Sequence, residues 1–465
     1  MITPDSPVRT SFGIAAPENF IDKSPKLRKI YEENHTWKVY SSTLQKKLPG
    51  PRPLGKLGRA IIDKAQCILP HRISIENLEK QLINYRLIST ADHHGLLNYK
   101  LLYNSNILFS KLIMELNLPF LIVPSSGNIP LTNISYPRGF YFKNKKFNFF
   151  SERKSRGPVF LFNGKIDGDE KKGLSSFISN LDSISLTKDE SNFLEFLFFH
   201  ELEIHKISQE VISFQDQISV LNFKLWKYFF RRDIRSRIPD ILYLQVNRLI
   251  ERILIDELKD KDSLISGILF KREIRNEYLK GFKGIRGAWG DDGKGSHFFW
   301  GIDEKQRFIN LVTDSNYDLL KGENFKLELT PEAVMDGLEK KQISPTLFMD
   351  FLILAFLEGY VCLGGSNQLD YLPLMQRAHV SCLNNLKMTS IADDFSERIT
   401  DGLICGLIPF EYGSGMDLIW EHNCYKGKFN GNLDGGLSEE ELKYIDHLKI
   451  QKLIENGIEY MTEII

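Results

Sequence analysis

The stretch STADHHGLLNYKLLYNSN, residues 89–106, places an aspartate and two adjacent histidines directly before a glycine. The short run RLI, with apolar Leu87 and Ile88, precedes the stretch. A helical pattern follows in YNSNILFSKLIMELNL, where Leu108, Leu112 and Leu116 share one stripe. The next apolar run, PFLIVPS, predicts a buried strand. This order of strand, loop, helix and strand is typical of a βαβ unit, so we expect a parallel sheet covered by helices.

The loop in this stretch is expected at the carboxyl end of a strand, where α/β proteins usually bind their ligands. Histidine can transfer a proton or bind a metal, and an aspartate can orient it. Free N–H groups near Gly95 would attract an anion. A polar loop whose histidines only cap backbone groups is the alternative. We predict Asp92, His93 and His94 as catalytic residues.

Two more loops are expected to follow strands. In CLGGSNQLDYL, residues 362–372, a glycine pair precedes short polar side chains at a helix start. In SSGNIPLTNISYPRG, residues 125–139, amide and hydroxyl groups are dense, and such groups could hold a carboxylate or phosphate. Structured turns are the alternative. The predicted substrate-binding residues are Gly95, Asn98, Asn128, Asn133, Arg138, Gly364, Gly365, Asn367 and Gln368.

The length and charge of the chain limit the classes of protein to consider. The 465 residues exceed the usual size of one hydrophobic core, which indicates two or three modules. Sixty basic residues balance sixty acidic ones, so no overall field attracts nucleic acid or an anionic membrane. A local basic patch at FFRRDIRSR, residues 229–237, stays open. We expect no nucleic-acid or membrane partner.

The cysteines and the apolar segments indicate a cytoplasmic protein. The five cysteines are scattered without a CxxC pair, which argues against a disulfide framework and a structural zinc site. FHELEIH lacks the spacing of an HExxH zinc motif. The first residues contain no apolar signal segment, and the run from Leu347 to Leu357 is too short to span a bilayer.

The fold class that these patterns predict is α/β, with a Rossmann-like parallel sheet, inserted connecting segments and a long helical insert. Residues 1–70 are expected to form an irregular N-terminal arm, and 71–185 the first half of the core. Residues 186–280 have almost no glycine and are expected to form the helical insert, divided at Pro239. Residues 281–465 are expected to complete the core and add C-terminal helices.

Short local signals predict several further elements. Residues 137–150 and 157–164 indicate short strands or a hairpin, and SHFFWGIDEKQRFINLV indicates two strands joined by a turn. Ser74 is expected to cap a helix over 73–85. The pairs Thr330–Pro331 and Ser344–Pro345 indicate helix starts. Ser438 and Glu441 form the pattern of a capping box before a terminal amphipathic helix.

The first stretch resembles the cysteine-adding ligases of bacillithiol synthesis. Those proteins have a strand that ends in TGQQxGLF and then a GPLYT helix entry. With one extra residue, TADHHGLLNYKLLYN follows the same pattern. The matching positions are Thr90, Gly95, Leu96 and Leu97, while Ala91, Asp92 and His93 stand where the family has Gly-Gln-Gln.

A later segment carries the second part of the resemblance. The order from LTPEAVMDGLEKKQISPTLF to YVCLGGSNQLDYL is similar to the family's segment that ends in LPTAAYVGGPGEIAYF. Gly364, Gly365 and Tyr371 match, and Gln368 stands where the family has glutamate. The likeness covers residues 75–130 and 296–380. The family's Asp-His-Asp after the second strand is replaced here by SSGNIPLTN.

The resemblance implies a Rossmann-like core and a reaction that joins an amino acid to an amine through an amide bond. It does not imply bacillithiol synthesis itself, because titratable groups replace the family's neutral amides. In this interpretation the chain is a ligase of a specialised biosynthetic pathway, with a small-molecule amine and an amino acid as partners and ATP as the candidate cofactor. His93 or His94 is the general base, Asp92 orients it, and the N–H groups of Gly95 and Gly365 hold phosphate or carboxylate.

Two other classes stay open. In a metal-dependent hydrolase or oxygenase, Asp92 and the adjacent histidines would hold the ion, and His297 or His379 would supply a further ligand. In a non-catalytic relative, the same loops would bind a nucleotide or metabolite without turnover. Stoichiometric metal in the purified protein would distinguish the first of these classes from a ligase.

Overall fold

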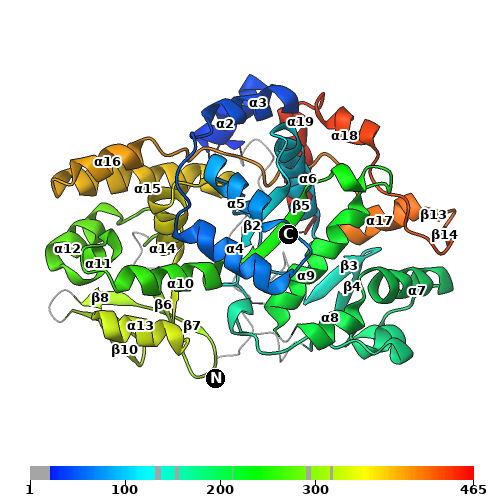
Figure 1. Cartoon of the computed structure of the whole chain (residues 1–465), viewed down its shortest axis with the longest axis horizontal. Coiled ribbons are helices and arrows are strands. Elements are labelled where there is room, and N and C mark those ends of the chain that lie inside the picture. Colours follow the sequence, from blue (N-terminus) through cyan, green and yellow to red (C-terminus); the bar gives the residue numbers. More distant parts are fainter. Residues whose placement is uncertain are drawn as a thin grey trace.

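The computed structural model describes residues 21–22, 24–130, 138–151, 157–211, 213–289, 295–314 and 318–464. Figure 1 shows a mixed α/β molecule in which β2 and β5 lie near the centre and helices surround them. The α-helices are α2 (Pro25–Glu33), α3 (Trp37–Lys47), α4 (Lys56–Ile68), α5 (Ile75–Asn84), α6 (Lys100–Glu115), α7 (Lys188–Glu195), α8 (Ile204–Glu210), α9 (Phe214–Trp226), α10 (Val246–Leu258), α11 (Leu264–Phe270), α12 (Arg272–Gly281), α13 (Pro331–Glu339), α14 (Leu347–Phe351), α15 (Ser366–Asn385), α16 (Thr389–Ser396), α17 (Gly415–Asn423), α18 (Glu439–Ile445) and α19 (Ile450–Ile464). The strands are β1 (Leu87–Ser89), β2 (Phe120–Ser125), β3 (Gly139–Phe142), β4 (Lys145–Asn148), β5 (Asp240–Gln245), β6 (Phe299–Ile302), β7 (Phe308–Asn310), β8 (Val312–Asp314), β9 (Leu319–Gly322), β10 (Phe325–Glu328), β11 (Ile343–Pro345), β12 (Val361–Leu363), β13 (Cys424–Tyr425) and β14 (Lys428–Phe429).

Two small parallel sheets form the centre of the molecule. β1 pairs with β12, and β2 pairs with β5, both in parallel register. Just beyond β1, a parallel bridge between His93 and Ser126 joins the two pairs. Every residue of β1, β2 and β12 is buried, as expected for parallel strands that are covered on both faces.

Helices cover these strands because their apolar faces need burial. α6 follows β1 and packs on β2, and α9 packs on β5. α4 contacts β5 and also α5, α9 and α10. Leu108 and Leu112 of α6, from the stripe in the sequence, are fully buried, whereas Leu116 lies at the C-cap and is partly exposed. The unit β1–α6–β2 therefore has the predicted order.

Smaller antiparallel sheets lie at the periphery. β3 and β4 form a hairpin beside α7 and α8, and β6 lies between β7 and β11. β8, β9 and β10 form a further antiparallel sheet next to α13 (Figure 1). The predicted hairpins over 137–150 and within SHFFWGIDEKQRFINLV are confirmed in their described parts. Residues 159–161, expected to be extended, form a 3-10 turn instead.

The prediction of an irregular N-terminal arm is wrong for the described residues up to position 70. They form α2, α3 and α4. Pro25 is the first residue of α2 and Gly55 is the N-cap residue of α4, so these two residues mark helix starts. The helices are held by burial of residues such as Trp37 and Leu57, which are fully inaccessible.

The prediction of a helical insert over residues 186–280 is wrong in one part, because the segment also contributes a strand to the centre of the molecule. The segment contains shorter helices, α7 to α12, and the strand β5 directly after Pro239. Proline ends a helix, and the run ILYL that follows favours a buried strand. Because β5 pairs with β2, this segment is part of the central sheet.

The capping signals were accurate at most positions. Ser74 caps α5, Thr330 caps α13, and Ser438 with Glu441 forms both bonds of a capping box at α18. The predicted helix start at Ser344–Pro345 is wrong, because both residues lie in β11. The next helix, α14, begins at Leu347 after Thr346.

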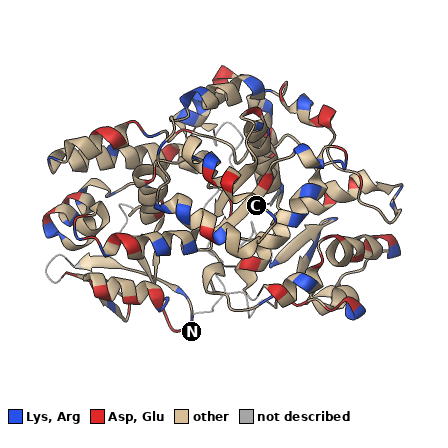
Figure 2. Cartoon of the chain, in the orientation of Figure 1, with Lys and Arg blue, Asp and Glu red and all other residues tan. Residues whose placement is uncertain are grey.

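Charges of both signs are mixed over the whole ribbon in Figure 2. The arginines of the FFRRDIRSR stretch do not form a free basic patch. Arg231, Arg232 and Arg237 make ion pairs with Asp233, Asp434 and Glu439. Arg235 donates to backbone carbonyl oxygens. Among the residues described, no helix has both the length and the apolar composition needed to cross a bilayer.

Candidate functional site

The loops that follow β1, β2 and β12 meet at the carboxyl ends of these strands. The His94 N–H donates to the Ser126 carbonyl oxygen at 2.7 Å, and the Ser126 N–H donates to the Asp92 carbonyl oxygen at 2.8 Å. The Thr90 hydroxyl donates to the Gln368 side-chain oxygen at 2.9 Å. Two loops that are far apart in sequence are therefore tied to the loop that contains Asp92.

Asp92 is fully buried at this edge. Its Oδ2 accepts a hydrogen bond from the Asn106 amide at 2.9 Å, whereas its Oδ1 has no partner. Burial raises the pKa of the Asp92 carboxyl to about 7, against the lowering effect of the Asn106 hydrogen bond and of the nearby Tyr243 hydroxyl. A carboxyl with this pKa gains or releases a proton near neutrality, which general acid–base chemistry requires.

His94 is engaged on both sides of its ring. Nε2 lies 2.9 Å from the Gln215 carbonyl oxygen, and Nδ1 lies 2.8 Å from the Ser125 hydroxyl. A carbonyl oxygen only accepts, so Nε2 carries the proton and Nδ1 accepts from Ser125. Burial lowers the pKa of His94 to about 4, so the ring is neutral at pH 7. His94 thus ties the loop after β1 to β2 through Ser125 and to α9 through Gln215.

His93 is the histidine with access to solvent. Its side chain is partly exposed, whereas that of His94 is fully buried. Burial lowers the pKa of His93 to about 4, so it is neutral at pH 7 and able to accept a proton. Its carbonyl oxygen accepts from the Tyr243 hydroxyl at 2.5 Å, which fixes the backbone at this position.

Gly95 and Asn98 lie in a section of the loop that is held by other side chains. Asn222 of α9 donates to the Gly95 carbonyl oxygen at 2.9 Å and accepts from the Leu97 N–H at 2.7 Å. Asn98 is buried, and its side-chain oxygen accepts from the Tyr141 N–H at 2.7 Å. The Asn98 amide nitrogen has no partner, so it could still meet a ligand.

The amide side chains of Asn128 and Gln368 hold the loops together. Asn128 donates to the Pro345 carbonyl oxygen at 3.0 Å and accepts from the Ser344 hydroxyl at 2.8 Å. Gln368 donates to the Cys362 carbonyl oxygen at 2.9 Å, in addition to its bond from Thr90. These hydrogen bonds occupy both ends of each amide, so the two residues shape the site.

Gly364 is required by a close approach. A Cβ at this position would lie 2.2 Å from the Gln368 side chain. Gly365 is the N-cap residue of α15, where a Cβ would meet only ordinary contacts. Asn367 is exposed in the first turn of that helix, and Arg138 is half-buried with its Nε unpartnered. Asn133 lies outside the described residues.

Sequence reasoning missed several residues of this edge. Asn106 lies in a polar trio with Asn104 and Ser105 on α6, and all three are fully buried. Three consecutive polar residues between apolar runs of one helix were the available signal. Tyr243 was missed because β5 was interpreted as helix. Asp92, His93, His94, Asn106 and Tyr243 are called the strand-edge cluster below.

Cys405 lies close enough to Asp92 for the carboxylate to influence its ionisation. Burial, with the Asp92 charge as a second contribution, raises the pKa of the Cys405 thiol to about 12. The thiol is protonated at neutral pH, and a thiol is a weak nucleophile. Cys405 is therefore a neutral neighbour of the carboxyl.

A metal-binding arrangement is not found in the residues that the structure describes, where no three His, Cys, Asp or Glu side chains are grouped for one ion. The two histidines considered as further ligands are placed differently. The His297 Nδ1 accepts from the Thr313 N–H at 2.9 Å. His379 is fully buried among aromatic rings, and neither of its ring nitrogens has a partner.

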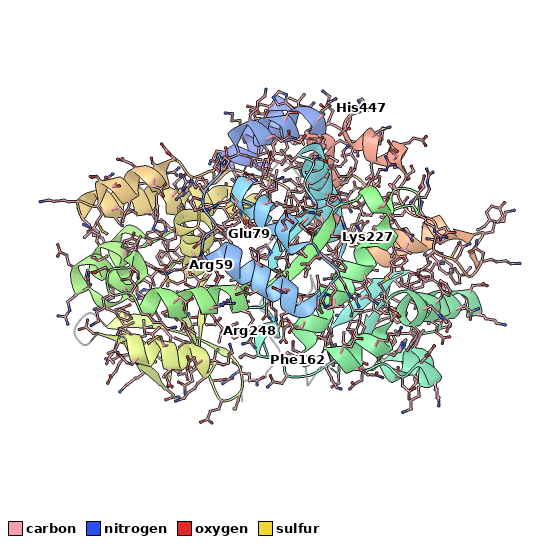
Figure 3. The ribbon with its side chains drawn as sticks, in the orientation of Figure 1. Arg59, Glu79, Phe162, Lys227, Arg248 and His447 are labelled. Atoms are coloured by element: carbon pink, nitrogen blue, oxygen red, sulfur yellow. The ribbon has the colours of Figure 1, made fainter. Side chains whose placement is uncertain are left out.

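A wide cavity lies in another part of the molecule, between the start of α10 and the antiparallel strands β6, β7, β9 and β10. Its volume is about 1380 Å³. Arg248, labelled in Figure 3, lies at this cavity. None of the predicted site residues lines it.

Comparisons with protein-family models, curated proteins and solved structures found no match to this chain.

Proposed function

We propose that the chain is an amide-bond-forming ligase with a Rossmann-like core, which joins an amino acid to a small-molecule amine in a specialised biosynthetic pathway. The observation that carries the proposal is the hydrogen bond from Thr90 to Gln368, at 2.9 Å, beside the parallel pair β1–β12. These two segments are the two parts of the sequence that resemble the ligase family. If the resemblance of these two distant segments to the ligase family were accidental, there would be no reason for the segments to lie in contact in the fold.

The strand-edge cluster has groups suited to an amine. The Oδ1 atoms of Asp92 and Asn106 are both buried acceptors without a partner. Buried polar atoms normally have partners, and an amine supplies donors. Binding of an ammonium group at this point would favour the ionised form of the Asp92 carboxyl.

The proton step is assigned to His93. Amide formation requires the attacking amine to lose a proton as its nitrogen bonds to the carbonyl carbon of the activated amino acid, while the bond from that carbon to the activating group breaks and this group leaves with the oxygen that joined it to the carbon. His93 is neutral at pH 7 and partly exposed, so it can accept that proton. His94 cannot accept it without breaking its bond with Ser125, since its other nitrogen already donates to Gln215. Asp92 holds the amine.

The predicted site residues offer few groups that could hold the phosphates of ATP. Apart from the histidines, Arg138 is the one cation among them. Gly364 accommodates Gln368, and no space for a phosphate is evident at its Cα. We therefore assign no step to ATP at this edge.

The proposal is tested by a search for condensation products. The purified chain is incubated with the twenty amino acids, a panel of primary amines that includes amino sugars and diamines, and ATP present or absent. Products are read by mass spectrometry as the sum of two reactants minus water. We expect His93→Ala to lower product formation by about 100-fold, the usual contribution of a general base.

His447→Ala is the matched control, because His447 is an exposed histidine between α18 and α19 and is not one of the predicted site residues (Figure 3). It should retain wild-type turnover. Equal product formation by His93→Ala and His447→Ala would remove His93 from the mechanism. Absence of any condensation product across the panel would contradict the ligase proposal.

A further inference from the structure

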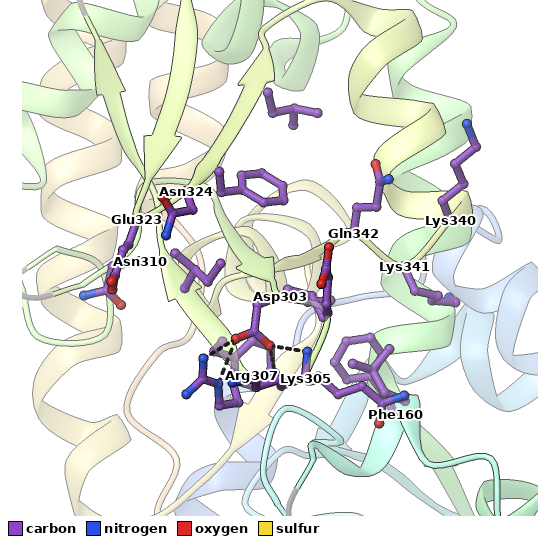
Figure 4. Close-up of a pocket in the computed structure, with 18 of the residues that line it drawn as sticks. Phe160, Asp303, Lys305, Arg307, Asn310, Glu323, Asn324, Lys340, Lys341 and Gln342 are labelled. Carbon is purple, nitrogen blue, oxygen red and sulfur yellow. Dashed lines mark hydrogen bonds and ion pairs between the residues drawn. The ribbon is translucent and has the colours of Figure 1, made fainter.

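The wide cavity at the start of α10 is called the basic cavity below. Five segments line it: the 3-10 turn at 159–161, the first turn of α10, the β6–β7 hairpin, the β9–β10 hairpin and the connection from α13 to β11. Figure 4 shows Lys340, Lys341 and Gln342 on one side and the hairpin residues Asp303, Lys305 and Arg307 on another. The cavity thus lies between the helical layer and the peripheral strands.

The lining of the basic cavity has an excess of positive charge. Six of the side chains are basic and three are acidic. Arg248 and Lys341 both pair with one carboxylate, that of Glu251. One of these two positive charges is therefore not compensated by Glu251. Glu251 is buried, and its Oε1 has no partner, so the arrangement is built into the wall.

Other cations at the rim differ in how they are paired. Arg307 pairs with Asp303 at 2.6 Å, and Lys340 pairs with Asp336 at 2.8 Å. Lys305 and Lys326 are exposed and have no ion pair with any residue that the structure describes. They can therefore turn toward an anion without breaking an existing pair.

The positive charge of Lys341 is also only partly stabilised by its surroundings. Burial lowers the pKa of its ammonium group, and Glu251 offsets part of this effect. A second anion next to Arg248 would stabilise both cations, since an opposite charge within a few ångströms favours the charged form. Arginine also binds phosphate and carboxylate through two parallel N–H donors.

One wall of the cavity is apolar. Phe308 and Phe325 are half-buried, and Phe308 stacks on the buried Phe160 with ring centroids 6.2 Å apart and planes at 18°. Trp300 also contacts Phe308, at 5.7 Å between centroids. The rings thus form a supported surface against which the body of a ligand can pack.

We propose that the basic cavity binds a small anionic molecule, whose phosphate or carboxylate group is held by Arg248 and Lys341 and whose apolar body packs on Phe308 and Phe325. The proposal does not depend on ligase activity at the strand-edge cluster. It rests on the volume of the cavity, the shared carboxylate of Glu251 and the aromatic wall.

The test is calorimetric titration of the full chain at low salt with three probes: inorganic phosphate, ATP and citrate. Binding to one site by at least one probe is expected, and it should weaken as salt is added because the contacts are between charges. A higher affinity for ATP than for phosphate would indicate a phosphorylated ligand with an apolar body. A higher affinity for citrate than for either of the other probes would indicate a carboxylate ligand. No saturable binding by any of the three probes would overturn the proposal.

Variants on one helix locate the site. Arg248→Gln removes a cavity cation from the first turn of α10, and Lys259→Gln removes an exposed cation just past the other end of this helix. We expect binding to weaken about tenfold in Arg248→Gln and to stay unchanged in Lys259→Gln. Arg248 is partly exposed, so its loss should not prevent folding. Equal affinity of Arg248→Gln and wild type would overturn the proposal. Lys305→Glu provides a second, fully exposed variant and should also weaken binding.

Discussion

The strand-edge cluster and the basic cavity use polar residues in opposite ways. At the strand edge, Asp92 and His94 are fully buried, and burial shifts their pKa values. At the basic cavity, most charged side chains are partly or fully exposed and keep ordinary ion pairs. The comparison teaches that burial favours the uncharged forms of the carboxyl and the imidazole, whereas an open cavity retains permanent charge for binding.

The largest expected effect in this comparison is the loss of a buried hydrogen-bonded ring. His94→Ala removes the partners of Ser125 and Gln215 and leaves a cavity. The free energy of unfolding should fall by roughly 3–5 kcal/mol. Urea denaturation measures this as a lower midpoint. His447→Ala, at an exposed histidine, should stay near wild type, and similar midpoints for the two variants would show that His94 is not a structural centre.

The next effect is a pH dependence from Asp92. The folded chain keeps this proton up to about pH 7, whereas an unfolded aspartate releases it near its ordinary pKa of 3.8. Between these values the folded state binds more protons than the unfolded state, so the contribution of Asp92 to the free energy of unfolding falls as pH rises, by roughly 4 kcal/mol in all. Asparagine does not ionise, so Asp92→Asn should not show this decrease.

Denaturation of wild type and Asp92→Asn at several pH values between 4 and 8 tests the sign. The free energy of unfolding of Asp92→Asn should increase relative to that of wild type as the pH rises through this window. Parallel curves for the two proteins would show that the Asp92 carboxyl is not perturbed by burial, and would weaken the contrast between the two regions.

His379 separates the effect of burial from that of hydrogen bonding. Burial lowers its pKa to about 3 from an ordinary 6.5, so the unfolded chain takes up a proton below pH 6.5 and the folded chain does not. Stability from this group therefore falls as pH drops from 6.5 toward 3. His379→Phe fits the surrounding rings and should exceed wild type by roughly 2 kcal/mol at pH 5.

The control for His379→Phe is the same measurement at pH 8. At this pH residue 379 is uncharged in both wild type and variant, so their thermal or urea midpoints should lie much closer together than at pH 5. An equal difference at the two pH values would mean that packing, and not protonation, decides the effect of the substitution.

The smallest effect on stability is expected at the basic cavity. Lys326→Gln changes an exposed side chain without an ion pair among the described residues, so the unfolding free energy should change by no more than about 0.5 kcal/mol. Its affinity for the anionic probe should fall a few-fold. A large loss of stability with unchanged binding would assign Lys326 to the fold and not to the cavity.

Several elements could be predicted from the sequence because their causes are local. β1, β2 and β12 lie in short apolar runs, and α5, α13 and α18 begin at residues whose side chains cap the helix. β5 was missed because the surrounding segment is helix-like and the strand signal, the run ILYL after Pro239, is short. Its pairing partner β2 lies more than a hundred residues earlier in the chain, and a local pattern does not reveal this pairing.

The candidate site divides in the same way. The sequence alone determined that Asp92, His93 and His94 follow an apolar strand and precede a glycine, because strand and turn preferences act over a few residues. Only the tertiary structure decided that His94 is enclosed between Ser125 and Gln215 while His93 stays accessible, and that Asp92 meets Asn106 and Tyr243. It also decided that Arg248 and Lys341 share Glu251. Burial and charge pairing depend on neighbours brought together from distant parts of the chain, and a local pattern carries no record of them.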